Sequence, residues 1–411
     1  MRNISYFCIV KHLIYLFRYI FVLALVLSSA KTNAQTDSTI LKSMDSVQIS
    51  LLTCGPGTNV YSLYGHTAVR YHDLGRNQDV AVNYGMFSFQ KDHFILRFVF
   101  GLTDYEMGIE DFTSFITEYG SRGRWVNEQI LNLSREEKWA ITQAIDINYR
   151  PENRVYRYNY FYDNCSTRAR DLITDHIQGN VLYPENKNIT SSYREMIHQW
   201  TINDRWSRFG NDLLLGVKAD SKTNNSQQQF LPDSLRANFE HAIVITQNGQ
   251  RHPLVASSHY LVAKTLLNTS SSSITPMECM LLLFVVTLLI CLAEWRTKHI
   301  FWGYDLILLL ITGLAGIILT AMIFSQHPTV SLNFQILLLS PLSLIFLYPT
   351  VKQLRKRRIH TYLRLWALLL CMFLALSFFQ HYAEGMIIVA LSLLIRYGWL
   401  MFFSQKLTKQ T

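Results

Sequence analysis

The chain has 411 residues, of which 49% are hydrophobic, and its mean hydropathy of +0.11 is high for a soluble protein. The net charge is +9, yet residues 35–275 hold 23 Lys and Arg against 25 Asp and Glu, so the basic surplus lies outside them. That surplus lies in the N-terminal leader and in short segments between apolar runs, such as KQLRKRR, which is typical of a membrane protein and argues against a nucleic-acid partner.

Residues 1–34 have the pattern of an export signal. A basic flank with Lys11 and Arg18 is followed by the apolar run YIFVLALVLSSA, and then by Thr32 and Ala34 at positions that suit a signal peptidase. The alternative is an uncleaved anchor helix, because the leader is long and rich in tyrosine. Under either interpretation, the domain that follows leaves the cytoplasm.

Residues 35–267 have the mixed composition of a globular domain, and their pattern predicts an α+β fold. β-branched and aromatic content between glycine and Asn/Asp turns predicts four strands, at 47–54, 66–73, 79–89 and 93–101. Ser134 and Glu137 have the spacing of a capping box and open a predicted helix. A further predicted strand, RVYRYNYFY, leads into the sequence DNC at 163–165, after which helical spacing resumes.

Two polar segments interrupt these patterns. Residues 268–276 are a natural linker into the membrane part, and residues 217–229 are either a solvated insertion or a mobile loop. The chain has neither Cys and His at zinc spacing nor a Gly-rich phosphate loop, so we expect no metal and no cofactor.

Residues 277–411 are predicted to form a membrane domain of five helices. Five apolar runs, each close to the roughly 20 residues that cross a bilayer, lie at 277–294, 304–324, 333–350, 362–379 and 386–403. The segments RTKH, VKQLRKRR and the C-terminal tail are basic, whereas SQHPTVSLN and QHYAEG contain no Lys or Arg. This alternation predicts a cytoplasmic C-terminus and places the exported domain on the other side of the membrane.

Several polar side chains lie within or beside these runs. Arg396 would be costly in lipid, so it either faces the bundle or extends to the cytoplasmic rim, and we favour the rim. Others map to the outer rim, where we favour simple surface decoration: His327, Asn333, Gln335, His381 and Glu384.

Cys165 is the candidate nucleophile. If Asn164 or Asp163 caps the helix, Cys165 lies in its first turn, where free N–H groups and the helix dipole stabilise a thiolate. The alternative is a disulfide with Cys54, the only other cysteine of the exported domain. Cysteine count alone leaves both interpretations open.

A reactive thiol needs an imidazole to take its proton, and His66 is the candidate. It begins a predicted strand directly after a glycine, which leaves the ring accessible. Asn83 or Tyr84, on the next predicted strand, could orient that ring if the two strands pair as a hairpin. A histidine at such a position is otherwise an ordinary core or surface residue.

The order of these groups, a strand histidine, a polar residue on the next strand and then NC opening a helix, resembles the circularly permuted papain-like fold of the NlpC/P60 superfamily. The segments LLTCGPGTNVYSLYGHTAVRY, VNYGMFSF, FYDNCSTRARDLI, NDLLLG, FLPDSL, FSQHPTVSLN and SPLSLI more closely resemble the Lnb family of lipoprotein N-acyltransferases. That resemblance spans most of the mature chain. It implies that Cys165 is the nucleophile and His66 the base, in a periplasmic domain carried by a multi-pass bundle of the bacterial inner membrane.

The resemblance also implies a reaction. A phospholipid would donate an acyl chain to Cys165, and the thioester would pass it to the α-amino group of the diacylglyceryl-cysteine of an apolipoprotein. Backbone N–H groups near Cys165, with Asn164 or Arg168 as further candidates, would stabilise the oxyanion. The alternatives are a membrane-tethered thiol amidase of the cell envelope and a non-catalytic envelope binding protein with a Cys54–Cys165 disulfide.

Overall fold

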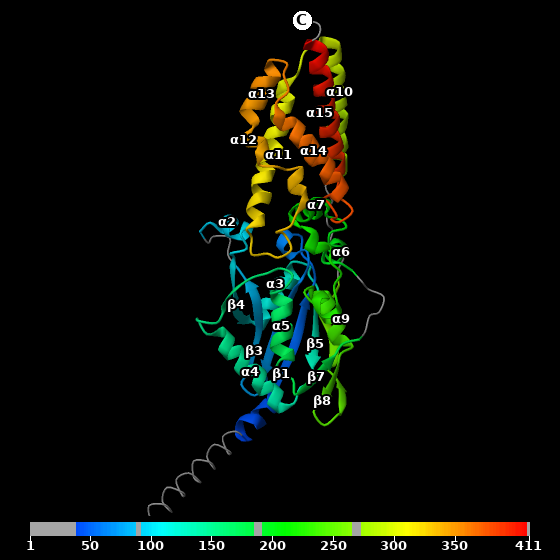
Figure 1. The fold of residues 1–411 in the computed structure, drawn as a ribbon. Coiled ribbons are helices and arrows are strands. Elements are labelled where there is room, and N and C mark those ends of the chain that lie inside the picture. The colour runs from blue at the N-terminus through cyan, green and yellow to red at the C-terminus, as the bar shows by residue number, and fades with distance from the viewer. Residues whose placement is uncertain (1–37, 88–91, 185–190, 265–272, 409–411) are drawn as a thin grey trace, which may run out of the picture.

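The computed structural model describes residues 38–87, 92–184, 191–264 and 273–408. The described chain forms an α+β domain, with a helical bundle standing on one end of it (Figure 1). The predicted export signal, residues 1–34, lies outside the described residues. So does most of the predicted linker.

The α+β domain is built on an antiparallel seven-stranded sheet. In order across the sheet, its strands are β10 (Val255–Val262), β5 (Val126–Leu131), β1 (Val47–Cys54), β2 (His66–Asp73), β3 (Gln78–Met86), β4 (Asp104–Asp111) and β6 (Val155–Arg157). A smaller sheet contains β7 (Gly179–Leu182), β8 (Ile243–Thr246) and β9 (Arg251–Pro253). In the main sheet, the register sets Cys54 opposite His66, so the end of β1 and the start of β2 lie together.

Helices cover both faces of the main sheet and bury its alternating apolar side chains. One face packs against α4 (Arg135–Tyr149), α5 (Cys165–Thr174) and α9 (Pro232–Glu240). The other packs against α3 (Phe112–Ser121). Other helices of the domain are η1 (Met44–Ser46), η2 (Val60–Ser62), α2 (Phe94–Val99), α6 (Tyr193–Trp200), α7 (Arg205–Leu214), η3 (Val217–Asp220) and α8 (Asn225–Gln228), and residues 38–43 are also helical.

Most local predictions for this domain are confirmed, with one clear error. The strands at 47–54 and 66–73 have the predicted bounds, and Ser134 and Glu137 form the predicted capping box. The segment 93–101, predicted as a strand, is instead helix α2, which packs against the bundle. The tertiary contact overrides the strand propensity of its aromatic and β-branched residues. The segment RVYRYNYFY contains only the three-residue strand β6.

The bundle contains the five predicted apolar runs, but the third is not one straight helix. Three helices are long and apolar enough to cross a membrane among the described residues: α10 (Pro276–Thr297), α11 (Trp302–Ile323) and α15 (Met386–Thr408). The third run is η4 (Phe334–Leu337), α12 (Leu342–Ile345) and α13 (Leu347–Arg355), bent by 74°. The bend lies at Phe346, and Pro349 in α13 has no N–H to bond the Ile345 carbonyl one turn earlier. Helix α14 (Thr361–Leu376) has 16 residues, which is shorter than the roughly 20 that cross a bilayer.

Arg396 does not extend to the rim, so that prediction is wrong. Its side chain is fully buried within the bundle, where it donates to Glu294 and Asp305 at 2.7–2.8 Å. Both carboxylates are also buried, and Trp399 donates to Glu294. Two acids on other helices thus compensate the guanidinium, which removes the need to reach water.

The outer-rim side chains are not surface decoration either, because they join the bundle to the α+β domain. Gln335 donates to the Asp212 carbonyl at 2.8 Å, and Asn333 donates to the Leu213 carbonyl at 2.9 Å. The other contacts are Glu384 with Arg205, His381 with Asp220, and His327 with Phe98.

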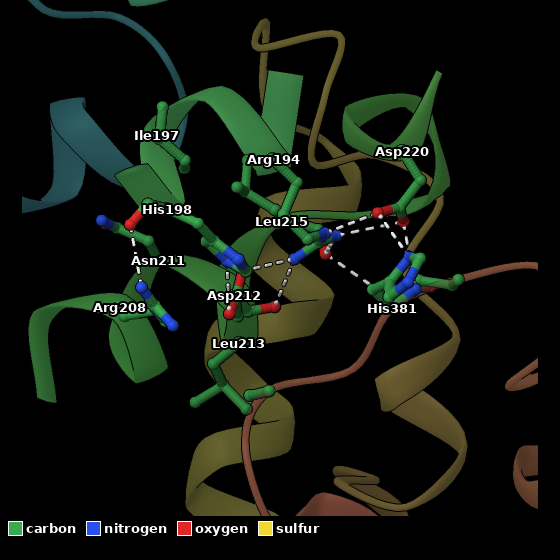
Figure 2. Close-up of polar contacts among 12 residues, drawn as sticks. Arg194, Ile197, His198, Arg208, Asn211, Asp212, Leu213, Leu215, Asp220 and His381 are labelled. Carbon is green, nitrogen blue, oxygen red and sulfur yellow. Dashed lines mark hydrogen bonds and ion pairs between the residues drawn. The ribbon is translucent and has the colours of Figure 1, made fainter. Parts of the chain in front are cut away.

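Arg194 of α6 is the centre of this joint (Figure 2). Its buried guanidinium donates to Asp212 at 2.8 Å and to Asp220 at 2.7 Å. Asp212 also bonds His198, and Asp220 bonds His381 from the loop before α15 (Figure 2). The joint therefore couples α6, α7 and η3 to the outer loops of the bundle.

Candidate active site

Cys165 is the first residue of α5, as its sequence context predicts. Asn164 caps this helix, and its side-chain oxygen accepts from the backbone N–H groups of Ser166 and Thr167 at 2.9 and 3.0 Å. These caps do not use the N–H of Cys165 itself. The sulfur therefore lies at the positive end of a helix, beside a backbone donor.

The side chains of Asn164 and Arg168, the two oxyanion donors suggested by the sequence, both have other partners in the structure. Both N–H groups of the Asn164 amide already donate to carbonyls, those of Tyr160 and Phe230, at 2.7 and 2.8 Å. Arg168 forms a bidentate ion pair with Asp163 and stacks over a tyrosine ring. Asn164 supports the site by capping, and Arg168 holds the turn before the helix.

His66 begins β2 at the same end of the sheet. Gly65 precedes it with φ +83, and a Cβ there would lie 2.6 Å from the Cys54 carbonyl oxygen, so only glycine fits this turn. The turn brings the His66 ring to the start of α5, close enough to Cys165 for each group to shift the pKa of the other. The thiol and the imidazole are 99 residues apart in the sequence.

Asn83 orients the imidazole, as predicted from the hairpin. Strands β2 and β3 pair with Ala68 opposite Asn83, and His66 Nε2 lies 2.9 Å from Asn83 Oδ1. Asn83 Nδ2 donates to Glu110 at 2.6 Å, which fixes which end of the amide faces the ring. Because Oδ1 can only accept, Nε2 carries the proton and Nδ1 is left to accept the thiol proton.

Tyr84, the other candidate for orienting His66, faces the opposite side of β3, because successive strand residues alternate. Its hydroxyl accepts from Asn148 at 3.0 Å. Tyr84 and Arg168 line a hollow of about 720 Å³ between α4 and α5, and neither Cys165 nor His66 belongs to its lining.

The electrostatics of the pair favour the ionised thiol. Burial would raise the pKa of Cys165, but the charge of His66 and hydrogen bonds from His66, the Thr67 backbone and Ser166 lower it below the ordinary value. Burial would lower the pKa of His66, but Cys165 and Asn83 together raise it. Both shifts favour a thiolate–imidazolium pair, the form that attacks an acyl carbonyl and transfers a proton.

Cys54 is not bonded to Cys165, since both are free thiols. Cys54 lies buried in the apolar cluster beneath α3, where burial raises its pKa to about 12. The disulfide assumed in the non-catalytic alternative is therefore not present in the structure. Cys54 is an inert core residue.

Sequence reasoning missed Glu110, Thr67 and Tyr156. Tyr156 has a buried hydroxyl with no hydrogen-bond partner among the described residues. This hydroxyl lies 3.7 Å from the position of a Cβ on Gly85, and the Cβ of Cys165 lies 3.9 Å from that same position. No local pattern marks these residues: Glu110 and Tyr156 reach the site through strand pairing, and Thr67 through the packing of α5 on β2.

The site lies at the end of the domain that faces the bundle. Asn211 of α7 donates to the Tyr64 hydroxyl at 2.6 Å, two residues before His66. Leu63 and Tyr64 also share an apolar cluster with Met322 and Val330 of the bundle. In the described part of the chain, no group of three or more His, Cys, Asp or Glu side chains could hold a metal ion.

Comparison with known families agrees with this two-part architecture. Residues 36–199 match the model of the Lnb N-terminal periplasmic domain, and residues 268–408 match that of the Lnb transmembrane domain. The chain belongs to the Lnb family. It is thus a membrane protein with a periplasmic N-terminal domain. No curated protein and no solved structure matches it.

Proposed function

We propose that this Lnb-family chain is a lipoprotein N-acyltransferase that works through a thioester on Cys165. The observation that carries the proposal is the Cys165–His66–Asn83 arrangement at the bundle-facing end of the sheet. A phospholipid donor and a lipoprotein acceptor both lie at the membrane surface, and confinement there raises their effective concentrations. A soluble peptide substrate would not need this placement.

In the first step, the Cys165 thiolate attacks the carbonyl carbon of a phospholipid acyl ester. A C–S bond forms and the ester C–O bond breaks. The His66 imidazolium gives its proton to the leaving alkoxide, which departs as a lysophospholipid hydroxyl. The backbone N–H of Cys165 and the hydroxyl of Tyr156, which has no partner among the described residues, are our candidates for the oxyanion donors.

In the second step, the α-amino group of a diacylglyceryl-cysteine attacks the thioester. An amide C–N bond forms, the C–S bond breaks, and His66 takes the amine proton. The products are an N-acylated lipoprotein and the original thiolate–imidazolium pair. Asn83, held by Glu110, keeps the ring in the orientation that both steps use.

The remaining parts of the proposal concern fold and topology. We assign the domain to the circularly permuted papain-like group, because its histidine strand precedes its cysteine helix. We assign residues 1–34 to a signal peptide, 35–267 to the catalytic domain, 268–276 to a linker and 277–411 to the inner-membrane bundle. The basic loops at the bundle end away from the domain support a cytoplasmic C-terminus.

The test uses the full chain reconstituted in vesicles whose phospholipid carries a labelled acyl chain. We expect a labelled, hydroxylamine-sensitive adduct on the Cys165 peptide, followed by transfer of one acyl group to a diacylglyceryl-cysteine peptide. Cys165→Ser, which has nearly the same shape, should abolish both while leaving the thermal unfolding temperature unchanged. In cells, Cys165→Ala should leave lipoprotein N-termini lighter by one acyl group.

Two outcomes would contradict the proposal. If lipoproteins keep an unchanged mass in cells with Cys165→Ala, the chain is not the acyltransferase. Hydrolysis of envelope peptides together with indifference to phospholipid would establish the thiol amidase instead.

A further inference from the structure

Helix α2 exposes apolar side chains at the end of the domain that faces the bundle. Leu96 is 58% exposed and Phe98 is 44% exposed, although both are large and apolar. Phe324, directly after α11, is 73% exposed. Apolar side chains gathered at one level of a membrane protein need a partner other than water.

The contacts of α2 place it where α11 leaves the membrane. The backbone N–H of Gln326 donates to the Phe100 carbonyl at 3.0 Å, and the rings of Phe98 and His327 are 6.3 Å apart. Figure 1 shows α2 beside the end of α11 that faces the domain. Since α11 is a span that ends at Ile323, α2 lies at the level of the outer leaflet surface.

The charges beside α2 suit the head group of a phospholipid. Arg97 and Arg157 both pair with one carboxylate, that of Asp104. These two guanidiniums lie at the level of the lipid phosphates, and Arg157 also donates to Gln326. The side chains of Arg97, Arg157 and Asp104 are all partly exposed.

A row of aromatic rings runs from α2 to the catalytic sulfur. Successive ring centroids are 6.4, 5.9, 4.9 and 4.1 Å apart in the order Phe98, Phe94, Phe87, Tyr105 and Tyr158. Tyr158 then borders Gly85, and so does Cys165. The row is continuous and mostly hydrocarbon, and it leads from the exposed Phe98 to Tyr105 in the core of the domain.

We propose that α2 docks on the outer leaflet and that this row of rings guides one acyl chain of a phospholipid to Cys165, with the phosphate held near Arg97 and Arg157. The inference rests on the proposed acyl transfer for its chemistry, but the docking of α2 on lipid can be tested without it. The occupant is an outer-leaflet phospholipid. The leader of this chain and a second copy are the competing occupants.

The first experiment detects lipid contact independently of catalysis. Benzoylphenylalanine replaces Phe98 in the full chain carrying Cys165→Ala, in phospholipid vesicles, and mass spectrometry identifies what it captures on illumination. We expect a phospholipid adduct. The control position is Leu74, which is also exposed and apolar but lies beyond the end of β2 farthest from His66, and it should capture no lipid. An adduct at position 98 with the leader or with a second copy would overturn the docking.

The second experiment separates delivery of the acyl chain along the row of rings from the acylation of Cys165 itself. Phe98→Asp should slow acylation of Cys165 by vesicle phospholipid at least about tenfold. Acylation by water-soluble p-nitrophenyl acetate should stay within about twofold of wild type, and Leu74→Asp should change neither rate. Unchanged phospholipid acylation, or an equal loss with both donors, would overturn the guiding role. If the wild type takes no acyl group from phospholipid, the proposed function fails, and the captured adduct still decides whether α2 contacts lipid.

Discussion

The molecule contains two ionic centres that differ in how completely their groups are satisfied. In the bundle, Arg396 is fully buried and its donors are matched by the oxygens of Glu294 and Asp305. At the end of the sheet, Cys165 and His66 are partly exposed, and the N–H of Cys165 is not used by the helix cap. A saturated ion pair holds structure together, whereas an unsaturated pair keeps groups available for a substrate.

Removal of the imidazole at the catalytic pair should cause the largest loss of activity. His66→Ala should reduce acyl transfer about 10²–10⁴-fold, because it removes the general base. It should also move the midpoint of Cys165 alkylation by iodoacetamide to higher pH, since His66 lowers the pKa of the thiol and burial alone would raise it. In the wild type, reactivity should therefore persist to lower pH than for an ordinary cysteine. An unshifted midpoint would mean that the two groups are not coupled.

Removal of the guanidinium from the saturated centre should damage stability instead. Arg396→Leu leaves two buried carboxylates without their partner, which costs about 3–5 kcal/mol. We expect a lower thermal unfolding temperature in detergent or nanodiscs. The combination of Arg396→Leu with Glu294→Gln and Asp305→Asn should recover most of that loss. A single variant as stable as the wild type would show that the centre does not stabilise the bundle.

The smallest effect should come from the group that holds Asn83. Glu110→Gln keeps the size of the side chain, and the amide oxygen can still accept from Asn83. We expect at most about a tenfold loss of acyl transfer, corresponding to about 1.4 kcal/mol, and no change in unfolding temperature. Asn83→Ala should be more harmful, because the ring loses its only described orienting contact on Nε2. Equal losses for the two variants would give Glu110 a direct role in the reaction.

The sequence predicts those features that depend on short-range pattern. Period-two strands place His66 and Asn83 on paired neighbours, and the helix that begins at Cys165 is marked by its cap and by its apolar spacing. Residues whose roles depend on distant partners were misjudged. Arg396 finds acids 102 and 91 residues away, and nothing near position 396 indicates them.

The strand prediction for residues 93–101 was wrong for a related reason. The aromatic and β-branched residues of α2 have strand propensity, but in the fold the helix lies against the end of α11, which follows more than 200 residues later. Asn164 shows how far the sequence can predict the contacts of a residue at the site. Its capping role follows from its position, while the two carbonyls that occupy its amide are contributed by the folded chain around it.

The joint centred on Arg194 has a consequence for client recognition. Buried ion pairs hold α6, α7 and η3 together, and amide contacts tie α7 to the outer loops of the bundle. The height of the sulfur above the lipid is therefore set by the protein itself. Under the proposed function, a client must bring its terminal amine to that height. We therefore expect lipoproteins whose folded body begins immediately after the lipidated cysteine to be acylated more slowly than those with an unstructured spacer at that point.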